Sequence, residues 1–254
     1  MKTRFVKEGV ALTTLVWLAT QPVTAALYTG NGLGTGVVGN GTLSLTDDGV
    51  KINAVFTKGA GGFEAFLVIY FDCRPGGYEN TSFFSDRTDA FTKTISGYGD
   101  VGRSLANFPP GFTADYALAL TGNSGVGGSL YELAAGGDGS FTRVASIDQY
   151  PINETDRGSY TFSIRWSDLG LTSSSSFRFQ STYIRDTGYR YLDTFEGLSG
   201  SAGFSTMTFT SFNVYPEPVP EPAHVALAIF GAGFVTVGVV RRAIRSHRNR
   251  GTGA

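Results

Sequence analysis

Residues 159–166 read Ser-Tyr-Thr-Phe-Ser-Ile-Arg-Trp, a strict alternation of polar residues with large apolar ones. The apolar side chains stand at every second position from 160 to 166, which is the period of a strand with one buried face. The stretch 50–57 has the same period, with apolar residues at its even positions. A chain that repeats this pattern without helical periodicity predicts an all-β fold.

A second kind of strand is indicated by residues 65–71, which are apolar on both faces and bounded by Gly62 and Pro75. Such a run is typical of a central strand with both faces covered. Further strands are predicted at 41–45, 114–120, 129–134, 141–146, 177–184 and 206–215. Thirty-five glycines punctuate these short segments, which favours an antiparallel β-sandwich.

The polar, glycine-broken segment 75–110 interrupts the strand pattern. A short helix is predicted over 86–95, which would bring Phe91 and Ile95 onto one face. A connection of this length is either functional or an addition that covers a sheet edge, and we favour the addition.

The C-terminal segment reads Val219-Pro220-Glu221-Pro222, followed after two residues by an uncharged run over 225–240 and then by an arginine cluster that includes Arg241, Arg242 and Arg245. An apolar run followed by arginines predicts a membrane helix with its basic end in the cytoplasm. Sixteen residues reach roughly 24 Å, short of the roughly 30 Å hydrocarbon core, so the anchor is marginal.

These three parts resemble the PEP-CTERM sorting signal of Gram-negative bacteria. The resemblance implies recognition of the tripeptide by exosortase, a membrane-embedded cysteine transpeptidase, and removal of the tail. A second Pro-Glu-Pro at 216–218 leaves the exact position of processing open. An ordinary tail anchor on a proline-rich stalk is the alternative.

The N-terminus carries the features of a secretory signal peptide. Basic residues precede an apolar stretch over 9–19, and small residues lead to a predicted cleavage between Ala25 and Ala26. The expected divisions are a signal peptide (1–25), a β-sandwich domain (26–215), a linker with the sorting motif (216–224), a membrane helix (225–240) and a basic tail (241–254). Export through the Sec translocon, anchoring in the inner membrane and then a place at the cell surface or in the extracellular matrix follow as expectations.

The composition of the domain excludes several kinds of function. Eighteen acidic and twelve basic side chains lie in 26–215, a net charge of −6, which argues against nucleic acid as a partner. Both histidines, His224 and His247, lie outside the domain, so catalysis that needs histidine and zinc sites that need imidazole are not expected. We expect no metal, cofactor or catalytic residue, and we expect Cys73 to be a small buried residue in a strand.

Within the domain, residues 160–170 read Tyr-Thr-Phe-Ser-Ile-Arg-Trp-Ser-Asp-Leu-Gly. This segment resembles the closing strand and turn of family-nine carbohydrate-binding modules and related DOMON-like sandwiches. The resemblance implies a jelly-roll-like β-sandwich that binds sugars in some relatives. The family's sugar-clamping tryptophan pair has no counterpart here, and the phase of Trp166 with Tyr160 and Ile164 predicts a core position.

Aromatic residues in loops or at strand ends could still bind sugar rings, and Tyr98, Tyr189 and Tyr191 are the candidate glycan contacts. The preferred hypothesis is a non-catalytic surface or matrix protein associated with exopolysaccharide. A dedicated carbohydrate-binding module is the alternative, and a glycosidase that uses two carboxylates is the third hypothesis.

Overall fold

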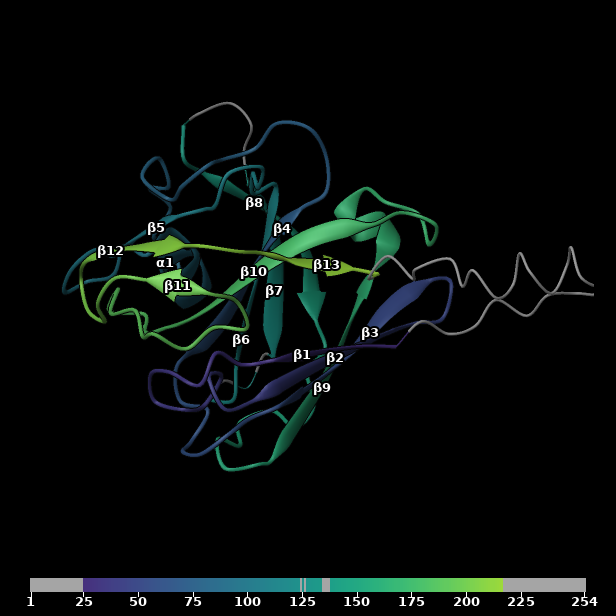
Figure 1. Cartoon of the computed structure of the whole chain (residues 1–254), viewed down its shortest axis with the longest axis horizontal. Helices are drawn as coiled ribbons and strands as arrows, with labels where there is room; N and C mark the ends of the chain where they lie inside the picture. The colour runs from purple at the N-terminus through teal and green to yellow at the C-terminus, as the bar shows by residue number, and fades with distance from the viewer. Residues whose placement is uncertain (1–24, 124, 126, 134–137, 217–254) are drawn as a thin grey trace, which may run out of the picture.

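A computed structural model describes residues 25–123, 125, 127–133 and 138–216. The predictions for the sorting motif, the membrane helix and the basic tail, and all of the signal peptide before Ala25, lie outside these residues. Two antiparallel sheets and one small sheet make up the described part of the chain (Figure 1). The all-β prediction is therefore confirmed.

The smaller of the two main sheets has four strands in the order β1-β2-β3-β9. Their bounds are Ala26–Thr29, Thr42–Asp47, Lys51–Thr57 and Ser159–Arg165. Their inward residues are buried and their outward residues are mostly exposed, which is the alternation that the sequence shows at 50–57 and 159–165.

The larger sheet has six strands in the order β13-β10-β4-β6-β7-β8. Their bounds are Asn213–Tyr215, Phe177–Ile184, Phe66–Asp72, Tyr116–Thr121, Gly128–Leu133 and Phe141–Ile147. The apolar strand β4 lies inside this sheet between β10 and β6, as its two apolar faces predict.

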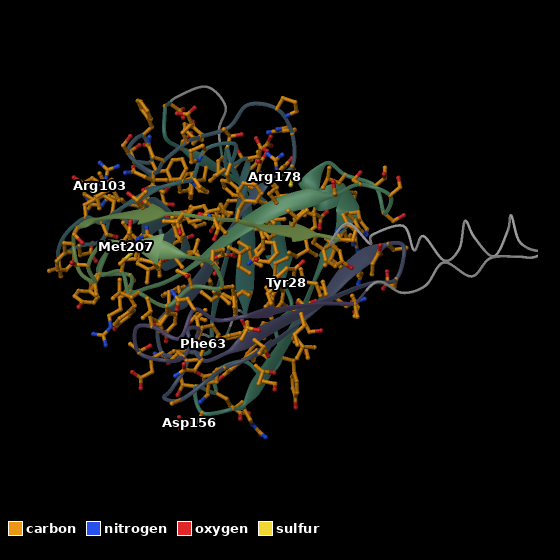
Figure 2. The ribbon with its side chains drawn as sticks, viewed as in Figure 1. Tyr28, Phe63, Arg103, Asp156, Arg178 and Met207 are labelled. Carbon is orange, nitrogen blue, oxygen red and sulfur yellow. The ribbon has the colours of Figure 1, made fainter. Side chains whose placement is uncertain are left out.

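One hydrophobic core fills the space between the two main sheets, where Figure 2 places the side chains of Tyr28 and Phe63. Aromatic rings dominate it, with Phe63 edge-on to Tyr160 at a centroid distance of 4.9 Å. Trp166 is only 3% exposed in this core, so the prediction that it is a core residue is confirmed. Burial of these side chains is the main force that holds the sheets together.

The segment after β4 covers the outer face of the six-stranded sheet, so the prediction that it covers a sheet edge was wrong. Helix α1 (Ala90–Ser96) packs on β4 and β6, and Ile95 belongs to a second core with Tyr70 and Phe108. A small sheet in the order β11-β12-β5 (Leu198–Ser199, Thr206–Phe209, Leu105–Asn107) completes this layer, with β12 parallel to β5.

Three predicted boundaries differ from the structure for local reasons. The helix begins at Ala90 rather than at residue 86, because Asp89 is its N-cap and accepts a 2.8 Å hydrogen bond from the Thr92 amide. Strand β9 ends at Arg165, and Trp166 begins the short 3₁₀ helix η1 (Trp166–Leu169). The single strand predicted at 206–215 is two strands, β12 and β13, which belong to different sheets.

Candidate functional site

The predicted cleavage site is the only part of the export signals within the described residues. Strand β1 begins at Ala26, directly after Ala25, and pairs with β2 from its first residue. No helix in the described part of the chain is long and apolar enough to cross a membrane.

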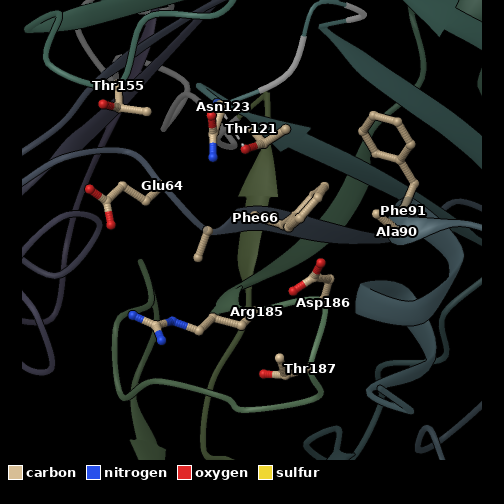
Figure 3. A pocket seen from close by; sticks show the side chains of 11 residues that line it. Glu64, Phe66, Ala90, Phe91, Thr121, Asn123, Thr155, Arg185, Asp186 and Thr187 are labelled. Carbon is tan, nitrogen blue, oxygen red and sulfur yellow. Dashed lines mark hydrogen bonds between the residues drawn. The ribbon is translucent and has the colours of Figure 1, made fainter. Parts of the chain in front are cut away.

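A groove of about 630 Å³ lies at one end of the six-stranded sheet (Figure 3). Its size lies within the range of small-ligand sites. Figure 3 shows Glu64 and Arg185 on one side of the groove and Phe66 and Phe91 on the other, with Asp186 near Phe66. The remaining lining residues are Ala65, Ala90, Thr121, Asn123, Thr155 and Thr187.

Strand register brings these residues together from distant parts of the sequence. Phe66, the first residue of β4, pairs with Ile184 at the end of β10 and with Thr121 at the end of β6. Because β6 and β10 are both antiparallel to β4, the start of β4 lies beside the ends of β6 and β10. Residues just outside these strands therefore gather at the same edge of the sheet.

A tight turn holds the charged side of the groove. The amide of Gly188 donates a 2.9 Å hydrogen bond to the carbonyl of Arg185, and the Arg185 amide donates one of 2.9 Å to the carbonyl of Tyr189. Gly188 has a φ of +86°, a conformation that glycine adopts without strain. This turn presents Arg185 and Asp186 from a fixed hairpin rather than from a long loop.

The groove combines an aromatic wall with polar groups that have no internal partner. The rings of Phe66 and Phe91 meet edge to face with centroids 5.5 Å apart, and both rings are half-buried. Within the described residues, the carboxylates of Glu64 and Asp186 form no hydrogen bond or ion pair and are exposed to solvent. These groups are free to bind a ligand that enters the groove.

A smaller hollow of about 180 Å³ adjoins the groove and shares Glu64, Ala65 and Arg185 with it. Tyr191 lines this hollow, and the Arg185 guanidinium lies over its ring, 5.6 Å from the centroid. Burial raises the pKa of Tyr191 above its usual range, and the charge of Arg185 partly offsets this effect. Of the three predicted glycan contacts, Tyr191 lines one of these two hollows and the other two line neither.

The other two tyrosines make contacts within the protein. The Tyr189 ring meets Tyr191 at 5.2 Å and Phe204 at 5.7 Å, and it lines neither hollow. The Tyr98 ring lies between two guanidinium groups, 4.5 Å from Arg87 and 4.9 Å from Arg103. The structure therefore brings Tyr189 and Tyr191 together but gives Tyr98 no place in the groove.

A second cavity of about 620 Å³ contains Asp72, Cys73 and Arg178. Its charged groups are already engaged, because Arg178 pairs with Asp72 at 3.2 Å. Cys73 follows the end of β4 and is half-buried, so its predicted place inside a strand was wrong. Burial raises the pKa of its thiol, and the neighbouring Asp115 and Asp72 carboxylates raise it further, so Cys73 is a poor nucleophile.

Glu196 is the carboxyl group with the strongest perturbation. Burial raises its pKa to about 8, although the Ser181 amide and hydroxyl and the Asn213 amide donate hydrogen bonds of 3.0, 2.9 and 3.0 Å to it. It lines neither the groove nor the second cavity. We therefore assign it to the packing of β10 against the 193–197 loop.

Among the described residues, no three side chains of histidine, cysteine, aspartate or glutamate converge as a metal site. Sequence reasoning missed Glu64, Phe66, Phe91 and Asp186 as candidate site residues. The turn sequence Asp186-Thr187-Gly188 and the Gly61-Gly62 pair before β4 mark the ends of strands at which such residues gather. Neither signal identifies the partner segments across the sheet.

Comparisons with known protein families, with curated proteins and with solved structures found no match to this chain.

Proposed function

We propose that the chain is a non-catalytic protein that is exported, sorted by exosortase and held at the cell surface or in the extracellular polysaccharide. The observation that carries the proposal is the three-part C-terminal segment, with Pro220-Glu221-Pro222, the uncharged run 225–240 and the arginines from Arg241 in that order. Each part has a separate physical role, and the order matches that of a sorting signal.

The position of the first strand supports export. The first strand begins at Ala26, the first residue after the predicted signal-peptide cleavage, and Ala26 itself is buried and paired with Leu45. The cleaved chain would therefore keep every strand that the structure describes. We also propose that the β-sandwich is jelly-roll-like and akin to family-nine carbohydrate-binding modules.

The chemistry of the two larger cavities supports a non-catalytic role. Residues 26–215 contain no histidine, and the carboxyl whose pKa burial raises to about 8, Glu196, lies outside both cavities. A glycosidase needs a carboxylic acid of raised pKa opposite a second carboxylate across the substrate. In the second cavity burial raises the pKa of Asp72, but its carboxylate is paired with Arg178 at 3.2 Å and no second carboxylate of the described chain lines that cavity.

The test compares the wild-type chain with Glu221→Ala and with Glu217→Ala in a host that carries exosortase, by intact mass and fractionation. We expect the wild type and Glu217→Ala to lose residues 241–254 and to reach the surface or the medium. Glu221→Ala is expected to stay full length in the inner membrane. Retention of the tail in all three proteins would instead indicate a tail-anchored domain and would refute the sorting proposal.

A further inference from the structure

We infer that the groove between Phe91 and Arg185 binds a neutral sugar chain of the extracellular matrix. This inference rests on the proposed function, which places the exported domain at the cell surface or in the extracellular polysaccharide. It adds which surface of the domain binds polysaccharide and which chemical class of polysaccharide that surface binds.

The first argument is the combination of side chains in the groove. Sugar rings have apolar C–H faces and a rim of hydroxyl groups, so they bind where an aromatic surface lies beside hydrogen-bonding groups. Phe66 and Phe91 supply two half-buried rings at a centroid distance of 5.5 Å. Asp186, Asn123 and Thr187 supply acceptors and donors on the same lining.

The second argument is that two carboxylates of the groove have no partner among the described residues and that one of them, Asp186, lies on a fixed turn. Asp186 lies in the hairpin turn fixed by Gly188, and Asn123 follows the end of β6. Within the described chain, the carboxylates of Glu64 and Asp186 have no hydrogen-bond or ion-pair partner. Binding groups on rigid elements lose little conformational freedom when a ligand arrives.

The third argument concerns the charge of the ligand. Two carboxylates, Glu64 and Asp186, line the groove together with one guanidinium, Arg185, which lies 5.6 Å from the centre of the Tyr191 ring. Asp156 lies close to Gly62 at the neighbouring hollow, and the domain as a whole has a net charge of −6. Acidic polysaccharides would be repelled by this surface, so the class that fits is neutral.

The second cavity does not compete for this role. Its charged groups are already paired, Asp72 with Arg178 at 3.2 Å and Arg74 with Glu132 outside the cavity. The ring of Phe212 at that cavity is covered by the Arg178 guanidinium, 5.1 Å from its centroid. Within the described residues, half-buried rings and unpaired carboxylates occur together at the groove.

The experiment uses the protein purified in the form that its host exports, run in native gels that contain dextran, a β-glucan, a mannan or, as the acidic probe, alginate. The variants are Asp186→Ala, which removes one hydrogen-bonding carboxylate, and Phe91→Leu, which removes one ring. Asp148→Ala is the matched control, because Asp148 is exposed and does not line the groove. Melting curves show that each variant is folded.

We expect at least one neutral polysaccharide to retard the wild type, and we expect added salt to leave this retardation unchanged. Asp186→Ala should weaken binding by about tenfold and Phe91→Leu by a similar factor, with no change for Asp148→Ala. Equal binding by all variants, retardation by alginate alone, or no retardation by any probe would each overturn the inference. The fractionation experiment with Glu221→Ala measures tail removal and location rather than binding to polysaccharide, so it tests the sorting proposal independently of this inference.

Discussion

The ring of Phe91 lies edge to face against the ring of Phe66, with an interplanar angle of 86°. Phe91 comes from α1 in the long segment after β4, and Phe66 is the first residue of β4 itself. This contact makes the long segment a wall of the groove as well as a cover for the sheet face. The segment that breaks the strand pattern therefore covers the sheet and also lines the groove.

A first prediction concerns Asp193, which anchors the 31–39 loop. Its fully buried carboxylate accepts hydrogen bonds from the Thr35 amide (2.5 Å) and hydroxyl (2.6 Å) and from the amides of Val37 (3.1 Å) and Val38 (3.3 Å). Asp193→Asn leaves some of these buried donors without an acceptor, so we expect a loss of about 3 kcal/mol in the free energy of unfolding. Urea denaturation of the wild type and of Asp193→Asn measures this loss.

The matched control for this variant is Asp148→Asn, which makes the same chemical change at an exposed position. We expect it to alter the free energy of unfolding by less than about 0.5 kcal/mol. Equal midpoints for the two variants would show that the Asp193 hydrogen bonds do not hold the loop.

A second prediction concerns Trp166, the only tryptophan in residues 26–215. Its indole nitrogen donates a 3.0 Å hydrogen bond to Asp47, and its ring stacks near Tyr215 at 6.2 Å. Trp166→Phe loses this hydrogen bond and leaves a small cavity, so we expect a loss of about 2 kcal/mol in stability. Thermal melts followed by circular dichroism test this, with the 74% exposed Tyr150 changed to Phe as an aromatic control.

The local patterns of the sequence predict the strands well but not the site. Alternation at 50–57 and 159–166 reports a buried and a solvated face, and β3 and β9 have both. The break between β12 and β13 was missed because both segments, with residues such as Phe209 and Val214, have high strand propensity. The two strands differ only in the sheet to which each belongs, and propensity does not report this. Propensity describes a segment and does not specify its partner.

The groove is harder to predict for the same reason. Glu64 and Asp186 meet because β4 pairs with β10 in one particular register, and Phe91 joins them because α1 packs on β4 and β6. A shift of one residue would turn Phe66 to the other face of the sheet. The sequence singles out Tyr191, which lines the adjoining hollow, because aromatic residues near strand ends are visible without the pairing. Tyr98 shows that this signal also selects residues with internal partners.

A third prediction concerns pH and Glu196. Burial raises the pKa of Glu196 from an ordinary value of 4.5 to about 8 in the folded protein, so the fold holds a proton that the unfolded chain releases. The contribution of Glu196 to stability is complete below about pH 4.5 and is lost as the pH rises to about 8. Compared with Glu196→Gln, the wild type should therefore lose up to about 1.4 kcal/mol per pH unit in this window.

Residues 26–215 contain no histidine, so no imidazole of the domain titrates in the same range. Urea denaturation of the wild type and of Glu196→Gln at several pH values between 5 and 8 gives the comparison. Parallel stability curves for the two proteins would show that Glu196 does not remain protonated in the fold.

The last prediction links packing to the groove through Gly99. A side-chain carbon at Gly99 would lie 1.8 Å from the Thr187 carbonyl carbon and 2.2 Å from the Gly188 nitrogen, both of them backbone atoms of the turn that carries Asp186. Backbone atoms cannot move aside as a flexible side chain would, so Gly99→Ala must displace this turn. We expect a loss of at least about 2 kcal/mol in stability together with weaker polysaccharide retardation. Gly158→Ala is the control, since a carbon added there meets nothing within 4 Å. A Gly99→Ala protein that is destabilised but still binds as the wild type does would show that the turn does not shape the groove.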